Sequence, residues 1–337
     1  MRVLLPLLFF ATSAAAQAPF VLAGESVPPG TTRSFLAGVA GTRVPITVIH
    51  GVRKGPVLTL TGGIHGDEFP SILALQRVRT QVCAADLAGV LVLVHVANLG
   101  SFHSGALTAL NPADGKNLNR VFPGSATGTP TERLAHFLTT EIVERTNYLI
   151  DMHSGSAGQQ LWPHVYSPFV GDEELDRRTL EFARATGMGH IVLYGDRPRD
   201  PARSISYPNT AMTRGKPGLT VEIGDLGRRD ESDIMAYLGV VRRAMQHLGM
   251  IPGTPPANDG AILYRKLWEV ESPADGTLHP KVRIGDLVGK GALLAEVTDY
   301  FGDKAGELRA PVQGIVLMLG HAPAVTKGRA PVTIGEW

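Results

Sequence analysis

Strand-like and helix-like hydrophobic patterns alternate through the first three quarters of the chain. Residues 90–96 form a continuous apolar run, which is typical of a strand buried on both faces. Elsewhere, apolar residues recur at helical spacing. The predicted helices span 70–82, 131–145, 172–186 and 231–248, and the predicted strands span 31–37, 43–50, 57–60, 90–96, 148–152, 191–193 and 219–223. This alternation predicts an α/β fold with a mixed, mostly parallel sheet flanked by helices.

The pattern changes after the proline-rich segment 251–256, which cannot continue a helix and is expected to be a linker. Beyond it, residues 272–278 are similar to residues 310–316. Two copies of a short strand-turn unit with no helical pattern predict a small all-β domain made of two interlocked halves.

This C-terminal domain resembles the barrel-sandwich fold of biotinyl and lipoyl carriers. Their modified lysine would fall at Lys304, but the methionine-flanked motif around it is absent. We therefore interpret Lys304 as a solvated turn residue.

The N-terminal residues have the layout of a secretory signal peptide. One arginine, Arg2, precedes an apolar stretch, and small residues follow it, with cleavage expected near Ala16 or Ala18. The stretch is shorter than the roughly 20 apolar residues of a transmembrane helix, so no stable membrane anchor is expected after cleavage. The predicted divisions of the chain are a signal peptide at 1–18, a catalytic α/β domain at 19–250 and a C-terminal β domain at 258–337. We expect a periplasmic or secreted protein.

The composition favours a small-molecule partner. With 337 residues, of which 44% are hydrophobic and 39 are glycine, the chain can form one large packed domain and a smaller one. The 32 lysines and arginines nearly cancel the 31 acidic residues, so no overall basic field favours nucleic acid or an anionic membrane. The lone Cys83 cannot form an internal disulfide.

The segment TGGIHGDEFPS, residues 61–71, follows a predicted strand and places His65 three residues before Glu68. Its glycines permit the backbone angles of a sharp turn into the next helix. Two interpretations stay open at this point: half of a metal site, or a helix N-cap with an incidental histidine.

A second polar segment, DMHSG, ends the strand predicted over 148–152. The carboxyl ends of parallel strands gather at one edge of a sheet, so His153 is expected to meet His65 and Glu68. Two imidazoles and one carboxylate, with a fourth position left for water, form the open zinc site of hydrolases. Asp151 lies on the same strand face as His153, where it either orients that imidazole or caps a backbone group.

Two further segments carry candidate chemistry. Glu222 lies among apolar neighbours at the end of a predicted strand, and a buried carboxylate needs a metal, a partner or a catalytic task. Beside zinc, it is expected to take a proton from water and pass it to a leaving amine. Asn119 and Arg120 precede a turn, and such a pair either grips a carboxylate or forms a surface salt-bridge element.

Together, GGIHGDE, DGKNLNRVFPG, DMHSG and TVEIG resemble, in this order, the succinylglutamate desuccinylase/aspartoacylase family, a branch of the zinc carboxypeptidase fold. The resemblance covers roughly residues 45–337, including the C-terminal β domain. It implies a zinc-carboxypeptidase-like α/β domain that binds one zinc. The implied roles are zinc binding by His65, Glu68 and His153, catalysis by Glu222, and binding of the substrate carboxylate by Asn119 and Arg120.

One feature departs from the family pattern. Family members commonly have an arginine that polarises the scissile carbonyl a few residues before the Asn-Arg pair, but residues 104–119 contain none. Either another arginine, such as Arg203 or Arg214, supplies that charge, or zinc acts alone.

The first functional hypothesis is a zinc-dependent hydrolase that cleaves the amide bond of a small N-acyl amino acid or a related carboxylate-bearing amide. An alternative within enzymes is an exported zinc carboxypeptidase that acts on short or cell-wall peptides. A third hypothesis is a zinc-containing binding protein that has lost catalysis, which the retained Glu222 opposes. The sequence does not predict the acyl group, the amine or the oligomeric state.

Overall fold

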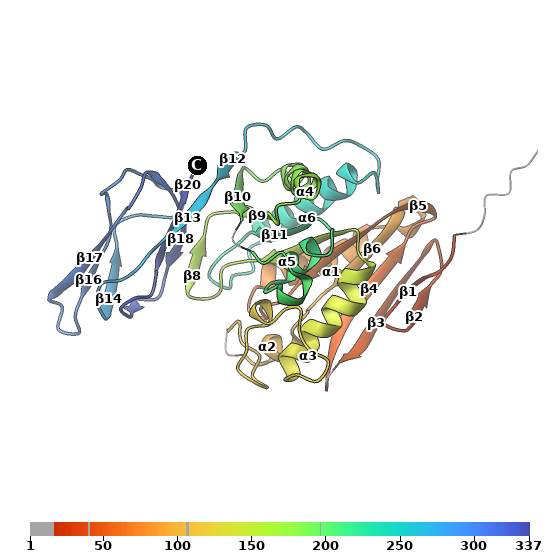
Figure 1. Cartoon of the computed structure of the whole chain (residues 1–337), viewed down its shortest axis with the longest axis horizontal. Coiled ribbons are helices and arrows are strands. Elements are labelled where there is room, and N and C mark those ends of the chain that lie inside the picture. Colours follow the sequence, from red (N-terminus) through yellow and green to blue (C-terminus); the bar gives the residue numbers. More distant parts are fainter. Residues whose placement is uncertain (1–16, 40, 106–107, 196) are drawn as a thin grey trace, which may run out of the picture.

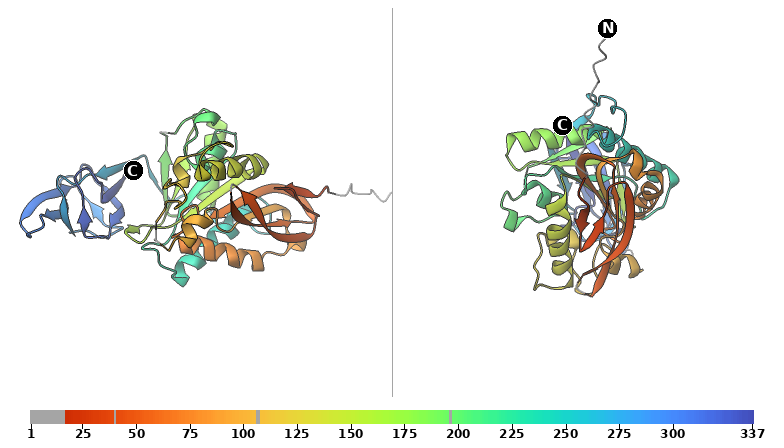
Figure 2. Two further views of the ribbon diagram at one scale, coloured as in Figure 1. Left: turned by 90° about the horizontal axis from the view of Figure 1, so that it is seen from below. Right: turned by 90° about the vertical axis from the view of Figure 1, so that its right-hand side faces the viewer.

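The computed structural model describes residues 17–39, 41–105, 108–195 and 197–337. Figure 1 and Figure 2 show two adjoining parts, an α/β part and a smaller β part formed by the C-terminal residues. The first sixteen residues of the predicted signal peptide lie outside the described residues. In the described part of the chain, no helix combines the length and the apolar character that a membrane span requires.

A large sheet lies at the centre of the α/β part (Figure 1). Its strands are β3 (Thr31–Val39), β4 (Thr42–His50), β5 (Arg53–Gly62), β6 (Ala88–Val94), β7 (Tyr148–His153), β9 (His164–Pro168), β10 (His190–Tyr194), β11 (Gly218–Glu222) and β12 (Ile262–Tyr264). Among the described residues these nine strands follow the order β12-β10-β9-β11-β7-β5-β6-β4-β3. Strands β6, β5, β7 and β11 pair in parallel, whereas β9 runs antiparallel to β11 and β4 to both β3 and β6. The predicted mixed, mostly parallel sheet is confirmed.

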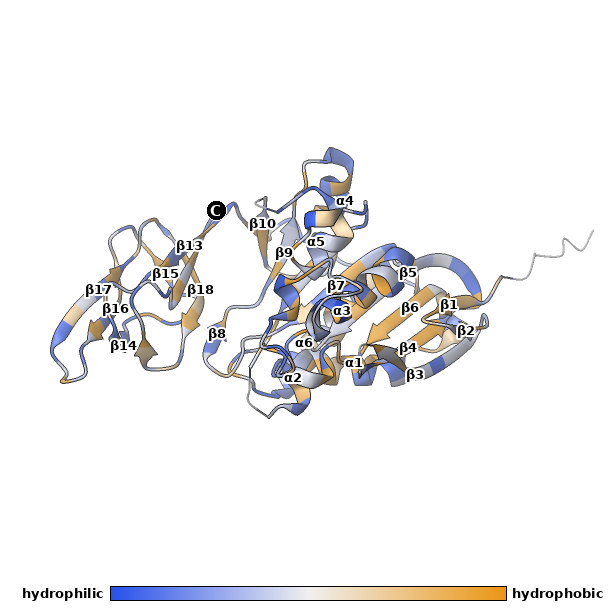
Figure 3. Cartoon of the chain, turned by 60° about the horizontal axis from the view of Figure 1, so that its bottom comes forward, coloured by the Kyte–Doolittle hydropathy of each residue, from blue (hydrophilic) through white to orange (hydrophobic). Residues whose placement is uncertain are grey.

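Helices cover both faces of this sheet. They are α1 (Phe69–Gln81), α2 (Leu99–His103), α3 (Pro130–Phe137), α4 (Glu173–Ala185), α5 (Tyr207–Met212) and α6 (Glu231–His247). Alternate residues of a strand point to opposite faces: in β6, Leu91 and Leu93 join a core with α1, α4 and α6, whereas Val90, Val92 and Val94 join a core with α3 and α5. These apolar strands stand out in Figure 3.

The predicted helices are present with small changes at their ends. Pro70 lies in the first turn of α1, where its missing amide hydrogen has no cost. The segment predicted as one helix over 131–145 is α3 followed by a π turn (Leu138–Ile142) and a 3-10 turn (Val143–Arg145). The short helix α5 and the strand β9 were not predicted.

The C-terminal part consists of antiparallel strands, as the sequence predicts. They are β13 (Lys266–Val270), β14 (Gly276–Pro280), β15 (Leu287–Val288), β16 (Leu293–Thr298), β17 (Lys304–Arg309), β18 (Gly314–Gly320), β19 (Ala324–Val325) and β20 (Val332–Glu336). One sheet has the order β13-β20-β18-β15 and the other has the order β17-β16-β14-β19. Lys304 is exposed at the start of β17, where its ammonium lies 2.5 Å from the Glu307 carboxylate.

Each of the two parts contributes one short strand to a sheet of the other part. The short strand β12 follows the predicted linker, yet it pairs in parallel with β10 at the edge of the large sheet. In return, β8 (Gln159–Leu161), from the α/β part, pairs with β18. Next to β8, the Trp162 ring packs so closely on Gly285 that an added Cβ there would lie 2.6 Å from it. The C-terminal part is therefore held against the carboxyl end of the large sheet.

Candidate metal centre and substrate cleft

The turn after β5 places His65 and Glu68 on one side. Of its three glycines, Gly63 alone has a positive φ, of 66°. Gly66 is needed for close packing: an added Cβ there would lie 2.0 Å from the backbone nitrogen of Phe102 in α2. Glu68 occupies the N-cap position of α1, but its side chain makes no capping hydrogen bond. The helix-cap interpretation is therefore wrong, and the carboxylate is available for another partner.

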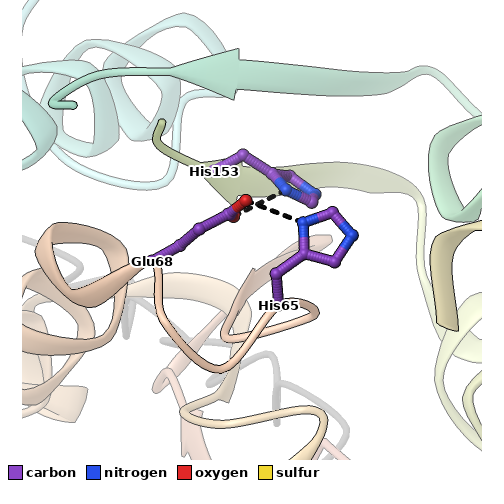
Figure 4. A group of neighbouring side chains, drawn as sticks. All are labelled: His65, Glu68 and His153. Carbon is purple, nitrogen blue, oxygen red and sulfur yellow. Dashed lines mark hydrogen bonds and ion pairs between the residues drawn. The ribbon is translucent and has the colours of Figure 1, made fainter. Parts of the chain in front are cut away.

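That partner is a pair of imidazoles (Figure 4). Glu68 Oε1 lies 2.7 Å from His65 Nδ1, and Glu68 Oε2 lies 2.7 Å from His153 Nδ1. His153 is the last residue of β7, which pairs directly with β5, so both chain segments end at the same edge of the sheet. One ligand atom from each of the three side chains lies within 4.8 Å of the other two. The structure brings together the residues predicted to bind metal.

The second ring nitrogen of each imidazole, Nε2, also has a hydrogen-bond partner. His153 Nε2 lies 2.7 Å from Asp151 Oδ2, and the Asp151 side chain is fully buried. His65 Nε2 donates to Asn117 Oδ1 over 3.1 Å. Acceptors of this kind fix the ring orientation and the tautomer of a metal-binding histidine. Asn117 was missed by the sequence analysis, although it lies two residues before Asn119 in the same segment.

Opposite charges compensate for burial in this cluster. Burial alone would raise the pKa of Glu68, but the adjacent imidazoles of His153 and His65 lower it well below its usual value. Burial would lower the pKa of His153, but the carboxylates of Asp151 and Glu68 raise it well above its usual value. The inner nitrogen of His153 therefore faces carboxylates that favour a positive charge at this position.

Glu222 ends β11, directly opposite His153 in the pairing of β11 with β7. It is half-buried in the cleft wall, and burial raises the pKa of Glu222 to about 8, assisted by the negative charges of Glu68 and Asp151 and opposed by His153 and Arg120. A carboxyl group with such a pKa can both accept and donate a proton near neutral pH.

Tyr237 of α6 joins the ends of the strands that carry His153 and Glu222. Its buried hydroxyl donates to the backbone carbonyl of His153 and lies 3.1 Å from that of Val221. It also accepts a hydrogen bond from the backbone amide of Ile223 over 3.2 Å. This hydroxyl therefore keeps the two strand ends aligned.

Asn119 and Arg120 line the same cleft as the metal cluster. Asn119 is buried, its Oδ1 accepts from the backbone amide of Tyr207 over 2.9 Å, and its Nδ2 lies 3.5 Å from His153 Nε2. Arg120 is exposed to the cleft, and its Nη1 donates to the carbonyl of Asn119 over 2.9 Å. Arg120 is thus a cleft residue of which one N–H group is held by the backbone.

The predicted metal ligands, Glu222 and the Asn119-Arg120 pair all line one cleft of about 980 Å³. Its floor is the carboxyl edge of the large sheet, and one wall comes from the C-terminal part. The wall residues from the C-terminal part are Arg265, Lys266, Leu267, Glu269, Met318 and Thr333.

The two arginines suggested as substitutes for the missing one do not line this cleft. Arg214 forms an ion pair with Glu144, with 2.9 Å between Nε and Oε1, and Arg203 is exposed elsewhere. From the same long loop it is Arg197 that reaches the cleft, where its guanidinium lies 4.1 Å from the centre of the Tyr194 ring. Sequence order alone did not show which part of the loop turns inward.

Comparisons with known proteins agree with this geometry. Residues 54–248 match the succinylglutamate desuccinylase/aspartoacylase catalytic domain. The chain is 30% identical to the N-alpha-acetyl-L-2,4-diaminobutyric acid deacetylase of Halomonas elongata over 87% of this chain and 85% of that protein.

Two solved structures share the fold over nearly the whole chain. One is a succinylglutamate desuccinylase/aspartoacylase from Rhodobacter sphaeroides, with a TM-score of 0.80, 26% identity, and coverage of 90% of this chain and 95% of that one. The other is the product-bound ectoine utilization protein EutE from Ruegeria pomeroyi, with a TM-score of 0.80, 25% identity, and coverage of 88% and 90%. The chain belongs to the succinylglutamate desuccinylase/aspartoacylase family.

Proposed function

We propose that this chain is a zinc-dependent hydrolase that removes a short acyl group from a small N-acylated amino acid. The observation that carries this proposal is the convergence of His65, Glu68 and His153 on one point beside Glu222, at the base of a cleft. Family membership supports hydrolysis of an amide bond.

The donor set fits one zinc ion per chain. Two imidazole nitrogens and one carboxylate are the ligands of many catalytic zinc sites. The outward nitrogens are already held by Asp151 and Asn117, so both rings turn Nδ1 inward. Buried Glu68 supplies negative charge, and a bound cation would favour the neutral form of both imidazoles. Bound zinc would lower the pKa of water and polarise the scissile carbonyl.

Glu222 is proposed as the proton carrier. Its position across from His153 suits a base that takes a proton from the attacking water and later gives it to the leaving amine. Burial raises the pKa of Glu222 to about 8, which supports a group that exchanges protons near neutral pH. Retention of this group opposes a purely binding role.

Arg120 is proposed to hold the substrate carboxylate, with Asn119 beside it. One edge of the guanidinium is fixed by the Asn119 carbonyl, which leaves other N–H groups for a paired contact with a carboxylate. Asn119 lines the cleft beside it, with its side chain oriented by the Tyr207 amide.

Among acyl groups, we favour acetyl. The relative that the chain resembles over most of its length is a deacetylase that acts on an acetylated amino acid. The same relative favours deacylation over the alternative of a carboxypeptidase for short or cell-wall peptides.

A substrate panel tests the proposed function. Zinc-loaded protein is assayed for release of acetate, succinate and free amine from N-acetyl and N-succinyl amino acids, with dipeptides in parallel. We expect turnover of N-acyl amino acids and at most weak cleavage of dipeptides. Efficient cleavage of dipeptides alone would show that the chain is a peptidase.

Export to the periplasm or the medium is also part of the proposal, and it rests on the sequence of the first eighteen residues. Intact mass of the protein purified from its native host is expected to correspond to a chain that begins near Gln17 or Pro19. A full-length mass from the cytosol would contradict export.

A further inference from the structure

Strand β9 places a histidine beside Glu222 that the metal cluster does not use. In the pairing of β9 with β11, His164 lies directly opposite Glu222, and in the pairing of β11 with β7, Glu222 lies opposite His153. Side chains that lie opposite each other in an antiparallel pair such as β9 and β11 share one face, with Cβ atoms about 4.5–5.5 Å apart. Tyr166, two residues further along β9, lines the cleft. His164 therefore flanks Glu222 on the cleft face, on the side away from His153.

The His164 ring is fully buried, and its tautomer is fixed by the backbone. Its Nδ1 lies 2.7 Å from the carbonyl oxygen of Trp162. A carbonyl can only accept, so Nδ1 carries the hydrogen, and Nε2 of the neutral ring is left as an acceptor. Burial lowers the pKa of His164 to about 4, so the ring stays neutral near neutral pH.

Nε2 of His164 has no hydrogen-bond partner among the residues that the structure describes, although it is completely buried. Unpaired buried groups of this kind often belong to catalytic sites. His164 is not one of the side chains that converge on the metal position. Two neighbours have other contacts: Tyr166 packs its ring on the imidazole, with 4.7 Å between the centres, and His190 Nδ1 lies 2.6 Å from the Tyr264 hydroxyl. From β11, it is the carboxyl group of Glu222 that faces His164.

We propose that His164 is a positioning residue for Glu222: its Nε2 accepts a hydrogen bond from the carboxyl O–H that Glu222 gains when it takes a proton from the attacking water. The inference rests on the proposed function and adds a residue to its proton-transfer step. The proton stays on Glu222 until the leaving amine takes it, and the imidazole remains neutral throughout. The hydrogen bond holds the protonated carboxyl in the cleft wall between these two transfers.

Two variants of His164 separate positioning from a structural role. His164→Asn places an amide near the Nδ1 position and can keep the Trp162 contact, but it does not reach the Nε2 position. His164→Gln places an amide carbonyl near the Nε2 position, where it can accept from Glu222. We expect His164→Asn to lower kcat roughly 5- to 100-fold, the scale of a donor left without its partner, and to change KM less than about twofold. His164→Gln should recover most of kcat.

A purely structural role predicts the opposite order of the two variants, because the hydrogen bond made by Nδ1 would be kept in His164→Asn and lost in His164→Gln. His190→Asn is the matched control, because this histidine lies on the adjacent strand β10, which does not pair with β11. It should leave kcat unchanged. The zinc content should stay at one per chain in all three variants, since none removes a ligand.

A double-mutant cycle isolates the contact with Glu222. In the Glu222→Gln protein, His164→Asn should lower kcat by less than about a further twofold, because the step that His164 assists is already lost. Wild-type kcat in His164→Asn, the opposite order of the two variants, or a full additional loss in the double variant would overturn the role of His164, while wild-type turnover still supports the deacylase. Failure of the zinc-loaded wild-type protein to hydrolyse any N-acyl amino acid would overturn the proposed function, and this inference with it.

Discussion

At the scale of single residues, the surroundings shift the pKa values of two carboxyl groups in one site in opposite directions. The imidazoles of His153 and His65 lower the pKa of Glu68 despite its burial, whereas burial raises the pKa of Glu222 to about 8. Carboxylates whose surroundings separate their pKa values in this way usually have different tasks. Glu68 is suited to bind a cation and Glu222 to carry a proton.

Replacing Glu222 separates these two tasks. Glu222→Gln preserves the size of the side chain but removes the proton acceptor, so turnover should fall on the order of 10²-fold to 10⁴-fold. The zinc content should stay at one per chain, because Glu222 is not among the three converging ligands. Turnover assays with elemental analysis of the same sample measure both. An active variant would remove Glu222 from the mechanism.

Replacing Arg120 tests the carboxylate contact. Arg120→Lys keeps the positive charge but loses the planar fork, so catalysis on carboxylate substrates should weaken by roughly 1.5–3 kcal/mol. A carboxamide analogue of the substrate should lose much less. Comparison of kcat/KM for both substrates in both proteins isolates the pairing. Equal losses on the two substrates would mean that Arg120 has a structural role.

Individual site residues could be predicted where a segment combines a strand end with a rare pattern of polar groups. His65, Glu68, His153 and Glu222 all follow apolar strands, and the structure gathers them. Asn117 was not distinguishable from its neighbours, because its role depends on which imidazole it meets across 52 residues of chain.

At the scale of elements, the site depends on the alignment of β5, β7 and β11, which end at the same edge of the sheet. Helix α6 stabilises this alignment through Tyr237. Its side chain is fully buried and contacts backbone groups of β7 and β11. Its hydroxyl fixes the ends of these strands, so Tyr237 is a positioning residue.

Removing the Tyr237 hydroxyl should loosen the site. Tyr237→Phe leaves buried backbone groups without a partner, which should lower the free energy of unfolding by about 1–3 kcal/mol. We expect kcat to fall while zinc is retained, since no ligand is removed. Tyr148→Phe, at the other end of β7, is the matched control, because that hydroxyl contacts Arg178 near the surface. If Tyr237→Phe had the same urea unfolding curve and the same kcat as the wild type, Tyr237 would not be a positioning residue.

Long, strongly patterned elements could be predicted and short ones could not. Helices α1, α4 and α6 have clear helical spacing over at least 13 residues. Helix α5 has six residues, and β8 and β12 have three each, which is too few for a period to emerge. The exchange of β8 and β12 between the two parts is set by long-range pairing, which local sequence does not encode.

At the scale of the whole molecule, the cleft exists because the two parts meet. Residues of β13, β18 and β20 complete a wall that the α/β part lacks. For this reason, the sequence did not indicate that the charged residues of that wall lie in the same cleft as the metal cluster. Their side chains come from beyond the linker.

Stability of the whole fold should depend on pH through a buried histidine. Burial lowers the pKa of His164 from 6.5 to about 4, and its Nδ1 donates to the Trp162 carbonyl over 2.7 Å. The unfolded chain then takes up a proton at a higher pH than the folded chain. The free energy of unfolding should therefore fall as the pH drops from about 6.5 to 4, by roughly 3 kcal/mol at most from this group.

His164→Asn retains a donor near the Trp162 carbonyl but does not titrate, so its free energy of unfolding should fall less over the same range. Urea unfolding of both proteins between pH 7 and pH 4 measures the difference. Parallel pH profiles for the two proteins would show that His164 is not a source of acid sensitivity.

The central claim, a single catalytic zinc held by His65, Glu68 and His153, is tested most directly by adding zinc to metal-free protein and following hydrolysis of an N-acetyl amino acid. The rate should rise in proportion to added zinc and level off at one equivalent per chain, and His65→Ala should stay inactive throughout. Full activity in the metal-free protein, or normal activation of His65→Ala, would contradict the account.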